Sequence, residues 1–303
     1  MTKPYYADET VTLYNAGCRE VLPSLADDSA DLVLTDPPYG VGKAEWDDEF
    51  PTFWMNDAAR IAPALGLMPG IWNIVRCPEE IGRLSYRWTL AAHLSNGKGR
   101  GALGLADWIP CLVYLADEAP AWCSRFADWC AVRGVSRRDL DRIAGTSDMG
   151  GWWLSRLPHR CQIPSAPQWE KLRAALTPPS EFDSWVYASD PFRDAGSTSK
   201  AFVIGREPMQ RHPSPKPLDV TRWFLHRMPG YDLGRGVVDP FAGSGTTLLA
   251  TRDFGRKAIG IEVSERYCEQ VAKRLAQMTL EPASQTSAHV SHESLSLLDL
   301  EAS

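Results

Sequence analysis

The stretch that decides the fold lies in the last third of the chain and reads Val237-Val238-Asp239-Pro240-Phe241-Ala242-Gly243-Ser244-Gly245-Thr246-Thr247. Its pattern predicts a buried strand, then a tight glycine turn, then the start of a helix, which is the order found in α/β units. Gly243 and Gly245 would let the backbone approach a ligand closely, and the helix start would offer it free N–H groups. The stretch therefore predicts a ligand site, or a structural turn that uses the same glycines.

The next expected strand supports the ligand interpretation. It covers 258–262 and ends at Glu262, twenty-three residues after Asp239, where a carboxylate can accept hydrogen bonds from a ribose diol. The glycine spacing departs from the Gly-x-Gly-x-x-Gly of dinucleotide sites, and the turn lacks the Gly-Lys-Ser/Thr of triphosphate loops. We therefore expect an adenosine-containing ligand that is neither a dinucleotide nor a triphosphate.

A second loop has the chemistry to hold an amino group. A strand expected over 31–35 runs into Asp36-Pro37-Pro38-Tyr39-Gly40, and the two prolines end that strand and remove two backbone donors. What remains is a stiff set of acceptors, the Asp36 carboxylate and the Pro37 carbonyl, beside the flat face of Tyr39. This arrangement suits an exocyclic –NH₂ on a ring. The alternative is a tight surface turn.

Together the two loops resemble the S-adenosylmethionine-dependent DNA methyltransferases that methylate amino groups. The Thr35–Gly40 motif precedes a central variable region and the Asp239–Thr246 motif follows it, which is the order of the beta subgroup; the resemblance covers about residues 10–118 and 186–275. It implies catalytic roles for Asp36, Pro37, Pro38 and Tyr39. It also implies S-adenosylmethionine as the cofactor, bound by Asp239, Pro240, Phe241, Ala242, Gly243, Ser244, Gly245, Thr246, Glu262, Lys216, Asn15 and Thr35.

Two further segments resemble parts of the same family. His212–Leu218 resembles the segment before the glycine strand, whose Lys-Pro step helps to wall the cofactor pocket. Leu13–Leu22 resembles the first strand and turn, where an Asp usually lies near the cofactor adenine, and here Gly17 stands at that position. Asn15 and Cys18 are the candidates to make the adenine contact instead.

The resemblance implies an α/β fold, a Rossmann-like methyltransferase sheet with helices on both faces, interrupted by a small helical insert that is similar to a helix-turn-helix. We expect residues 1–118 to form the catalytic half, 119–185 the insert, and 186–278 the cofactor-binding half. Residues 279–303 are rich in Ser, Ala and Glu without periodicity, which predicts a disordered tail. The strands before Asp36 and Asp239 should lie side by side. Other strands are expected over 12–15, 71–75 and 110–115, and a helix over 18–25.

The central block, 119–185, combines helical patterns with a basic charge balance. It holds nine basic and seven acidic residues, so its own net charge is about +2. Because the whole chain has a net charge of −6, the remainder carries about −8. Helices are expected over 121–133, over 137–144 between a Ser136 cap and Gly145, from Thr146 or Ser147 to Leu154, and over 167–176. The central pair resembles a regulator-type helix-turn-helix, whose second helix would face the major groove. DNA contacts are expected from Arg137, Arg138, Ser147 and Arg156.

Other interpretations of this block stay open. It can be a structural insert with a solvated charged face. Its tryptophans are expected to form a small core rather than to stack on bases. A Cys₃His zinc site of Cys123, Cys130, His159 and Cys161 is the metal alternative, but the first two cysteines are widely spaced for such a site, so no metal is expected.

The resemblance implies a site-specific enzyme that flips a base out of duplex DNA and methylates its amine without a covalent enzyme–base intermediate. Asp36 at the first motif position resembles the adenine enzymes, which favours N6 of adenine over N4 of cytosine, the alternative. A non-catalytic helix-turn-helix regulator on the same scaffold is a further alternative. A homodimer and a cognate restriction enzyme, as in restriction-modification, are compatible with the sequence, which fixes neither oligomeric state nor recognition site.

Composition places the chain among globular proteins without a membrane span. Of its 303 residues 44% are hydrophobic and 23% charged, and no apolar run approaches the roughly 18 residues of a span. The first residues lack the apolar core of a secretion signal, and seven cysteines without a Cys-x-x-Cys pair argue against a disulfide framework. We therefore expect reduced thiols, a cytoplasmic location and double-stranded DNA as the partner.

Overall fold

The structure is a computed structural model. It describes residues 2–43, 47–94, 99–101, 104–116, 121–156, 162–180, 182–183, 186, 199–202, 215–228 and 234–278. The tail predicted to be disordered, 279–303, lies outside these residues, as do the positions around the first expected domain boundary. The three-part division of the chain therefore stays a prediction.

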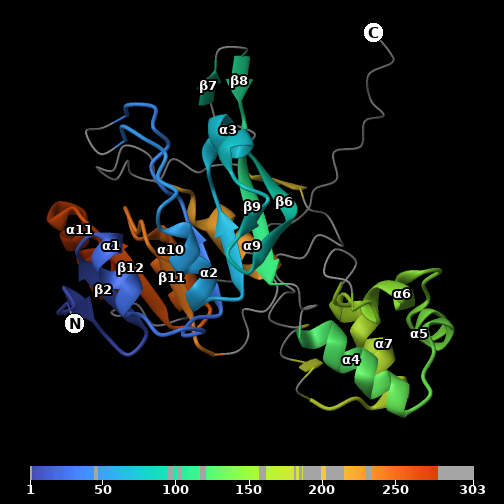
Figure 1. The fold of residues 1–303 in the computed structure, drawn as a ribbon. Helices are drawn as coiled ribbons and strands as arrows, with labels where there is room; N and C mark the ends of the chain where they lie inside the picture. The colour runs from blue at the N-terminus through green and yellow to red at the C-terminus, as the bar shows by residue number, and fades with distance from the viewer. Residues whose placement is uncertain are drawn as a thin grey trace, which may run out of the picture.

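A twisted mixed sheet forms the framework of the molecule (Figure 1). Its spatial order is β1 (Tyr6–Ala7), β2 (Val11–Asn15), β12 (Ala258–Glu262), β11 (Val237–Asp239), β3 (Leu32–Thr35), β4 (Ala64–Leu67), β9 (Trp108–Ala116), β6 (Leu84–Leu94) and β10 (Ser199–Phe202). The run from β2 to β4 is parallel, whereas β9 is antiparallel to both β4 and β6. A short strand, β5 (Glu80–Ile81), pairs with β6, and β7 (Gly99–Gly101) pairs with β8 (Gly104–Ala106) in a separate hairpin.

Helices cover both faces of the sheet, as expected, because its central strands are mostly apolar and need cover on each side. All residues of β3 and β4 are buried. On one face they pack against α1 (Cys18–Val21), η1 (Leu22–Ser24) and α2 (Met55–Ile61). On the other face the cover consists of α9 (Leu218–Arg227), α10 (Thr246–Asp253) and α11 (Glu265–Met278). None of the described helices has the length and apolarity needed to cross a bilayer.

The prediction of a strand over 71–75 is wrong. The segment forms a helical turn, α3 (Gly70–Asn73), followed by η2 (Ile74–Arg76). Gly70 has a φ of +67°, which turns the chain sharply after β4. The apolar run that suggested a buried strand lies partly in solvent, since Val75 is 91% exposed. The strands expected over 12–15, 31–35 and 110–115 are confirmed within β2, β3 and β9.

The central block is helical and lies beside the sheet (Figure 1). It contains α4 (Ala121–Val132), α5 (Arg137–Ala144), α6 (Met149–Trp153) and α7 (Ala166–Leu176). A separate apolar core joins them, in which Trp122, Trp153 and Trp169 are fully buried, so the prediction that the tryptophans form a core is confirmed for these three. The Ser136 cap and the left-handed Gly145 at the end of α5 are also confirmed.

The link between α5 and α6 departs from expectation. The helix expected from Thr146 or Ser147 starts at Met149, with Asp148 at its N-cap, and has only five residues. The buried Asp141 carboxylate holds this turn, because it accepts hydrogen bonds from the Thr146 hydroxyl (2.6 Å) and the Gly150 amide (2.9 Å). The two helices pack so closely that a β-carbon on Gly150 would lie 2.3 Å from the Arg137 carbonyl oxygen.

Candidate functional site

The two sequence motifs meet because their strands are neighbours. β3 and β11 pair in parallel, as predicted, so the loops that follow them leave the same edge of the sheet. The Thr35 hydroxyl at the end of β3 donates a hydrogen bond of 2.7 Å to the Asp239 carboxylate at the end of β11. This bond ties together two residues that are 204 positions apart in sequence.

A pocket, partly open to solvent, lies at this edge. Most of the expected site residues line it, namely Asp36, Pro37, Pro38, Tyr39, Lys216, Asp239, Phe241, Ala242, Gly243, Ser244, Thr246 and Glu262. Four expected residues are not part of this lining: Asn15, Thr35, Pro240 and Gly245. Five lining residues were not anticipated from the sequence: Lys43, Asp47, Met68, Thr247 and Tyr267.

Asp36 is engaged through both carboxylate oxygens. The Tyr39 hydroxyl donates to Oδ1 (2.5 Å), and the Lys216 ammonium donates to Oδ2. Burial, and then the nearby Asp36 charge, raise the pKa of Tyr39 well above its usual range, so the phenol stays a donor. Burial by itself would lower the pKa of Lys216, but the Asp36 carboxylate raises it above its ordinary value, so the ammonium stays charged.

Among the five lining residues that sequence reasoning missed, Asp47 makes the most hydrogen bonds to the catalytic loop. It is only 1% exposed, and its carboxylate accepts hydrogen bonds from the backbone amides of Tyr39 (2.5 Å), Gly40 (2.8 Å) and Lys43 (3.1 Å). It therefore anchors the loop that presents Tyr39. Nothing in the sequence separates Asp47 from its exposed neighbour Asp48, because only the folded loop brings its carboxylate to those amides.

The Tyr39 ring is held from a second side by the turn after β4. The Asn73 side-chain amide donates to the Tyr39 carbonyl oxygen (2.9 Å). A β-carbon added at Gly70 would lie 3.2 Å from the ring, so this turn passes close against it. The position of Tyr39 is thus fixed by residues from the segments that follow β3 and β4.

The glycine turn is held by Glu262 at the end of β12. The Glu262 carboxylate accepts from the Gly243 amide (2.9 Å) and from the Ser264 amide (2.8 Å), and burial raises its pKa. Gly243 has a φ of +51° and lines the pocket. The role expected for Gly245 differs from the observed one, because a β-carbon there would lie 2.7 Å from Val271, which makes it a packing position against α11.

Asp239 is a second almost fully buried acid of the pocket. Its side chain accepts from Thr35 and from the Phe241 amide (3.1 Å), and the residue is 2% exposed. Burial raises the pKa of Asp239 to about 6. This carboxyl therefore changes charge close to neutral pH, unlike an ordinary surface aspartate.

The two candidates for the adenine contact lie elsewhere. The Asn15 amide donates to the backbone carbonyls of Glu262 (3.1 Å) and Val263 (3.0 Å), so it fixes the end of β12. Cys18 is buried at the start of α1 and borders a different cavity, beside Phe53. Neither side chain lines the pocket, whereas the aromatic residues Phe241 and Tyr267 do.

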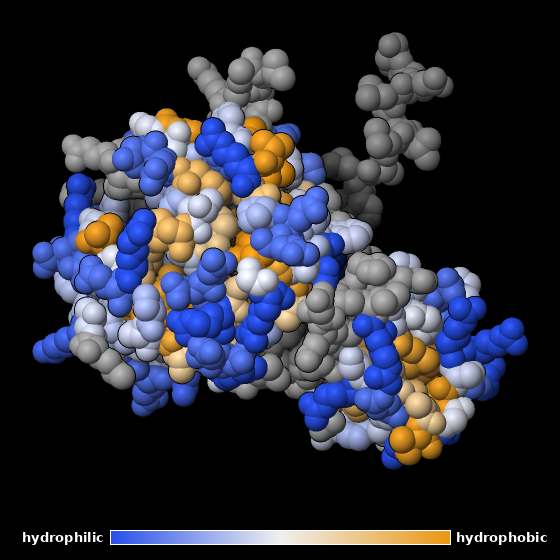
Figure 2. Space-filling view, in the orientation of Figure 1, coloured by the Kyte–Doolittle hydropathy of each residue, from blue (hydrophilic) through white to orange (hydrophobic). Residues whose placement is uncertain are grey.

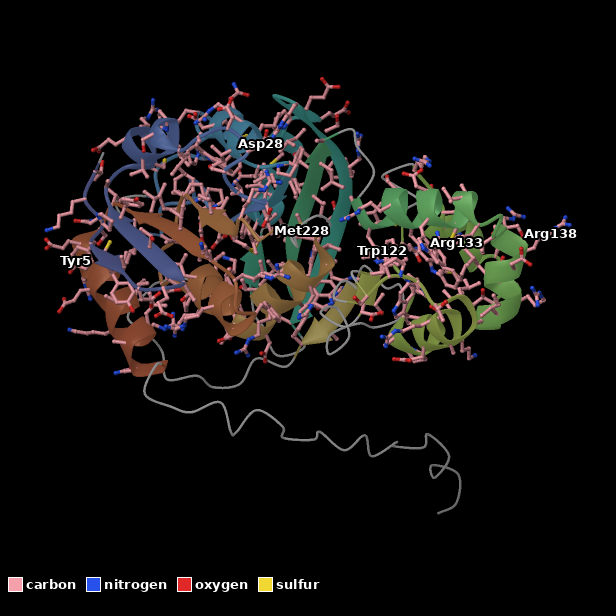
Figure 3. The ribbon with its side chains drawn as sticks, turned by 90° about the horizontal axis from the view of Figure 1, so that it is seen from below. Tyr5, Asp28, Trp122, Arg133, Arg138 and Met228 are labelled. Carbon is pink, nitrogen blue, oxygen red and sulfur yellow. The ribbon has the colours of Figure 1, made fainter. Side chains whose placement is uncertain are left out.

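The residues expected to contact DNA all lie on the surface of the helical block. Figure 3 shows Arg138 at the end of the block far from the sheet, while Trp122 lies inside it. Arg137 is paired with Asp148 at 3.9 Å and Arg156 with Asp128, and the side chains of all four are more than half exposed. Figure 2 shows apolar patches among the charged side chains on the visible face of the block.

The zinc alternative in this block stays a hypothesis, because two of its four ligands cannot be placed. Cys130 is a free, buried thiol. His159 and Cys161 lie outside the described residues.

Sequence comparison finds DNA methylases. The N6/N4 DNA methylase family model matches residues 157–273. The Type II methyltransferase M.ScaI of Streptomyces caespitosus is 26% identical, over 90% of this chain and 84% of that protein. The Type II methyltransferase M.HinfI of Haemophilus influenzae is 21% identical, over 93% of this chain and 73% of that protein.

Structural comparison finds the same fold. A crystal structure of the M1.HpyAVI–SAM complex superposes with a TM-score of 0.52 and 16% identity, covering 87% of this chain and 99% of that one. The PvuII DNA methyltransferase, named as cytosine-N4-specific, gives a TM-score of 0.52 at 15% identity, over 90% and 89% of the two chains. The arrangement of sheet, helices and loops is therefore that of known DNA methyltransferases.

Proposed function

We propose that the chain methylates N6 of an adenine flipped out of duplex DNA at a specific site, because it resembles S-adenosylmethionine-dependent DNA amino-methyltransferases in sequence and in fold. The observation that carries this proposal is that the Asp36–Tyr39 loop and the Asp239–Thr246 turn line one pocket. Such a pocket can align a methyl donor with an acceptor amine, and alignment supplies much of the rate gain when the methyl group is already activated.

The side chains of the pocket fit the cofactor group by group. Glu262 offers a carboxylate to ribose hydroxyls, and Lys216 offers an ammonium to the α-carboxylate. Asp239 offers a second carboxylate to the cofactor ammonium. When bound, S-adenosylmethionine supplies a methyl group on a positively charged sulfur.

The chain itself orients the base. The Tyr39 ring, fixed by Asp47 and Asn73, offers a face on which the flipped base stacks. The Asp36 carboxylate and the Pro37 carbonyl each accept one hydrogen of the exocyclic amine, which draws the nitrogen lone pair out of ring conjugation. The nitrogen could then accept the methyl group that the cofactor would supply, and Asp36 would pass the surplus amine proton to solvent.

The choice of adenine rests on Asp36 at the first position of the loop. N4 of cytosine is the alternative, because both amines present two hydrogens beside a flat ring. The fold does not separate the two, since a neighbour with this fold is named as cytosine-N4-specific.

We assign target reading to the helical block. Because α6 has only five residues, the start of α5 is the better candidate for DNA contact, with Arg137 and Arg138 on phosphates. Ser147, in the turn between α5 and α6, would lie near base edges. Arg156 would add a further phosphate contact after exchange of its Asp128 partner.

Mass spectrometry of nucleosides from the DNA of a host that expresses the protein tests the proposal. N6-methyladenine is the expected product, and it should be absent when the host expresses Asp36→Ala. N4-methylcytosine would move the assignment to the alternative base. No modified base at all would contradict the enzymatic assignment and favour a non-catalytic regulator. Sequencing that detects modified bases would add the recognition site.

A further inference from the structure

One cation covers both groups that should receive the target base. The Lys216 ammonium donates to the Asp36 carboxylate, and it lies 5.2 Å from the centroid of the Tyr39 ring. A base that stacks on this ring and donates its amine to Asp36 would compete with Lys216 for the same place. In this structure Lys216 thus already holds the Asp36 carboxylate that the base would use.

Separating Lys216 from Asp36 would cost considerable free energy. The two side chains are 11% and 23% exposed, and an ammonium at such depth requires an opposite charge nearby. The other carboxylates of the pocket are already committed: Asp47 to three backbone amides, Glu262 to two, and Asp239 to Thr35 and Phe241. A new anion is needed to draw the ammonium away.

The far side of Lys216 is suited to an anion. The Thr246 hydroxyl donates to the Lys216 backbone carbonyl (3.3 Å), which fastens the lysine to the first turn of α10. The Ser244 hydroxyl lies 3.0 Å from that of Thr246, and all three residues line the pocket. The start of a helix also carries partial positive charge. The methionyl carboxylate is the one anionic group of the cofactor.

We propose that Lys216 is a positioning residue that exchanges partners, pairing with Asp36 until S-adenosylmethionine binds and then with the cofactor carboxylate, so that base capture follows cofactor binding. The inference rests on the proposed function and adds an order of events to it. Two expectations follow from it: the enzyme distinguishes cofactors by their carboxylate, and a flipped base is held only after cofactor binding.

Calorimetry with two ligands tests the first expectation. The wild type should bind S-adenosylmethionine about 10- to 100-fold more tightly than decarboxylated S-adenosylmethionine, the range of one charge-assisted pair. Lys216→Met should bind the two within about threefold of each other, Lys216→Arg should keep much of the preference, and Lys273→Met on α11 should keep all of it. Equal losses for both ligands in Lys216→Met would overturn the exchange and leave a structural role.

Base capture tests the second expectation. The probe is a duplex with 2-aminopurine at the target position of the site found by modification sequencing, and sinefungin serves as an unreactive cofactor analogue that keeps the carboxylate. The wild type should raise the fluorescence severalfold only with sinefungin, whereas Lys216→Met should raise it without the analogue. A variant that still needs sinefungin contradicts the proposal. Failure of the wild type to bind S-adenosylmethionine would instead reject the proposed function itself.

Discussion

The catalytic edge of the sheet and the surface of the helical block differ in how deeply their charged residues are buried. At the sheet edge, Asp47 and Asp239 are almost fully buried, and each accepts hydrogen bonds that fix its orientation. On the block, Arg137 and Arg156 are exposed and make surface ion pairs, which contribute little to stability and exchange readily. The orientation of these two carboxylates is thus set before any ligand arrives, whereas DNA contacts can form by rearranging side chains in water.

The largest effect should come from Asp36, the centre of the rigid region. Asp36→Ala should lower the rate of methyl transfer about 10³-fold, because it removes a preorganised acceptor of the target amine. Binding of S-adenosylmethionine, measured by calorimetry, should be retained or become tighter, since Lys216 is then free of its protein partner. Methyl transfer is followed with radiolabelled cofactor. An active variant would contradict the catalytic role assigned to this loop.

The second-largest effect should come from a change at Asp47, because this residue acts on catalysis through Tyr39. Asp47→Asn should lower kcat about 10- to 100-fold and cost about 1–3 kcal/mol of unfolding free energy, since an amide cannot replace a carboxylate that accepts from three N–H groups. In a Tyr39→Ala background the same change should have little further effect on kcat. Asp48→Asn, at the exposed neighbour, is the matched control. Additive losses in the double variant would argue against action through Tyr39.

A pH dependence should follow from Asp239. Its folded-state pKa of about 6 lies above the ordinary value of 3.8, so the folded protein binds a proton more readily than the unfolded chain. The contribution of this group to stability is therefore present at low pH and is lost as the pH rises through about 6. Cofactor affinity should change in the opposite direction and fall up to about tenfold per unit below pH 6, as the carboxylate is protonated.

Thermal unfolding and calorimetry between pH 5 and 8 measure both effects. Asp239→Asn should remove the pH-dependent part of each, and it should be more stable than the wild type at pH 8. An unchanged pH profile of cofactor binding in Asp239→Asn would show that another group is responsible.

The smallest effect should come from the exposed region. Alanine at both Arg137 and Arg138 should weaken DNA binding several-fold and reduce the slope of log K against log salt by about 2, with kcat at saturating DNA unchanged. Fluorescence anisotropy over a salt series measures the slope. Lys273→Ala, on α11, is the control for loss of positive charge outside the helical block. An unchanged slope would show that these arginines do not contact DNA phosphates, and it would weaken the contrast between the two regions.

The sequence predicted what depends on local pattern. Buried strands, the two loops after β3 and β11, and the caps of α5 follow from runs of apolar residues and from glycine, proline and serine at fixed places. It did not reveal Asp47, because its role depends on amides brought together by the fold, and it misplaced the segment after β4, where apolar residues face solvent. The start of α6 was missed because Asp141, a residue of the preceding helix, sets that turn.

The hydrogen bond between Thr35 and Asp239 also bears on how the protein is made. A ribosome adds about 5–20 residues per second, so roughly 10–40 seconds pass between synthesis of the first residue and its partner 204 positions later. During that interval β3 exists without β11, its later neighbour, while the helical block can already bury its tryptophans. The nascent chain thus holds an unpaired strand edge that pairing within the same chain must eventually cover. Methyl transfer can begin only once the last third of the protein has emerged.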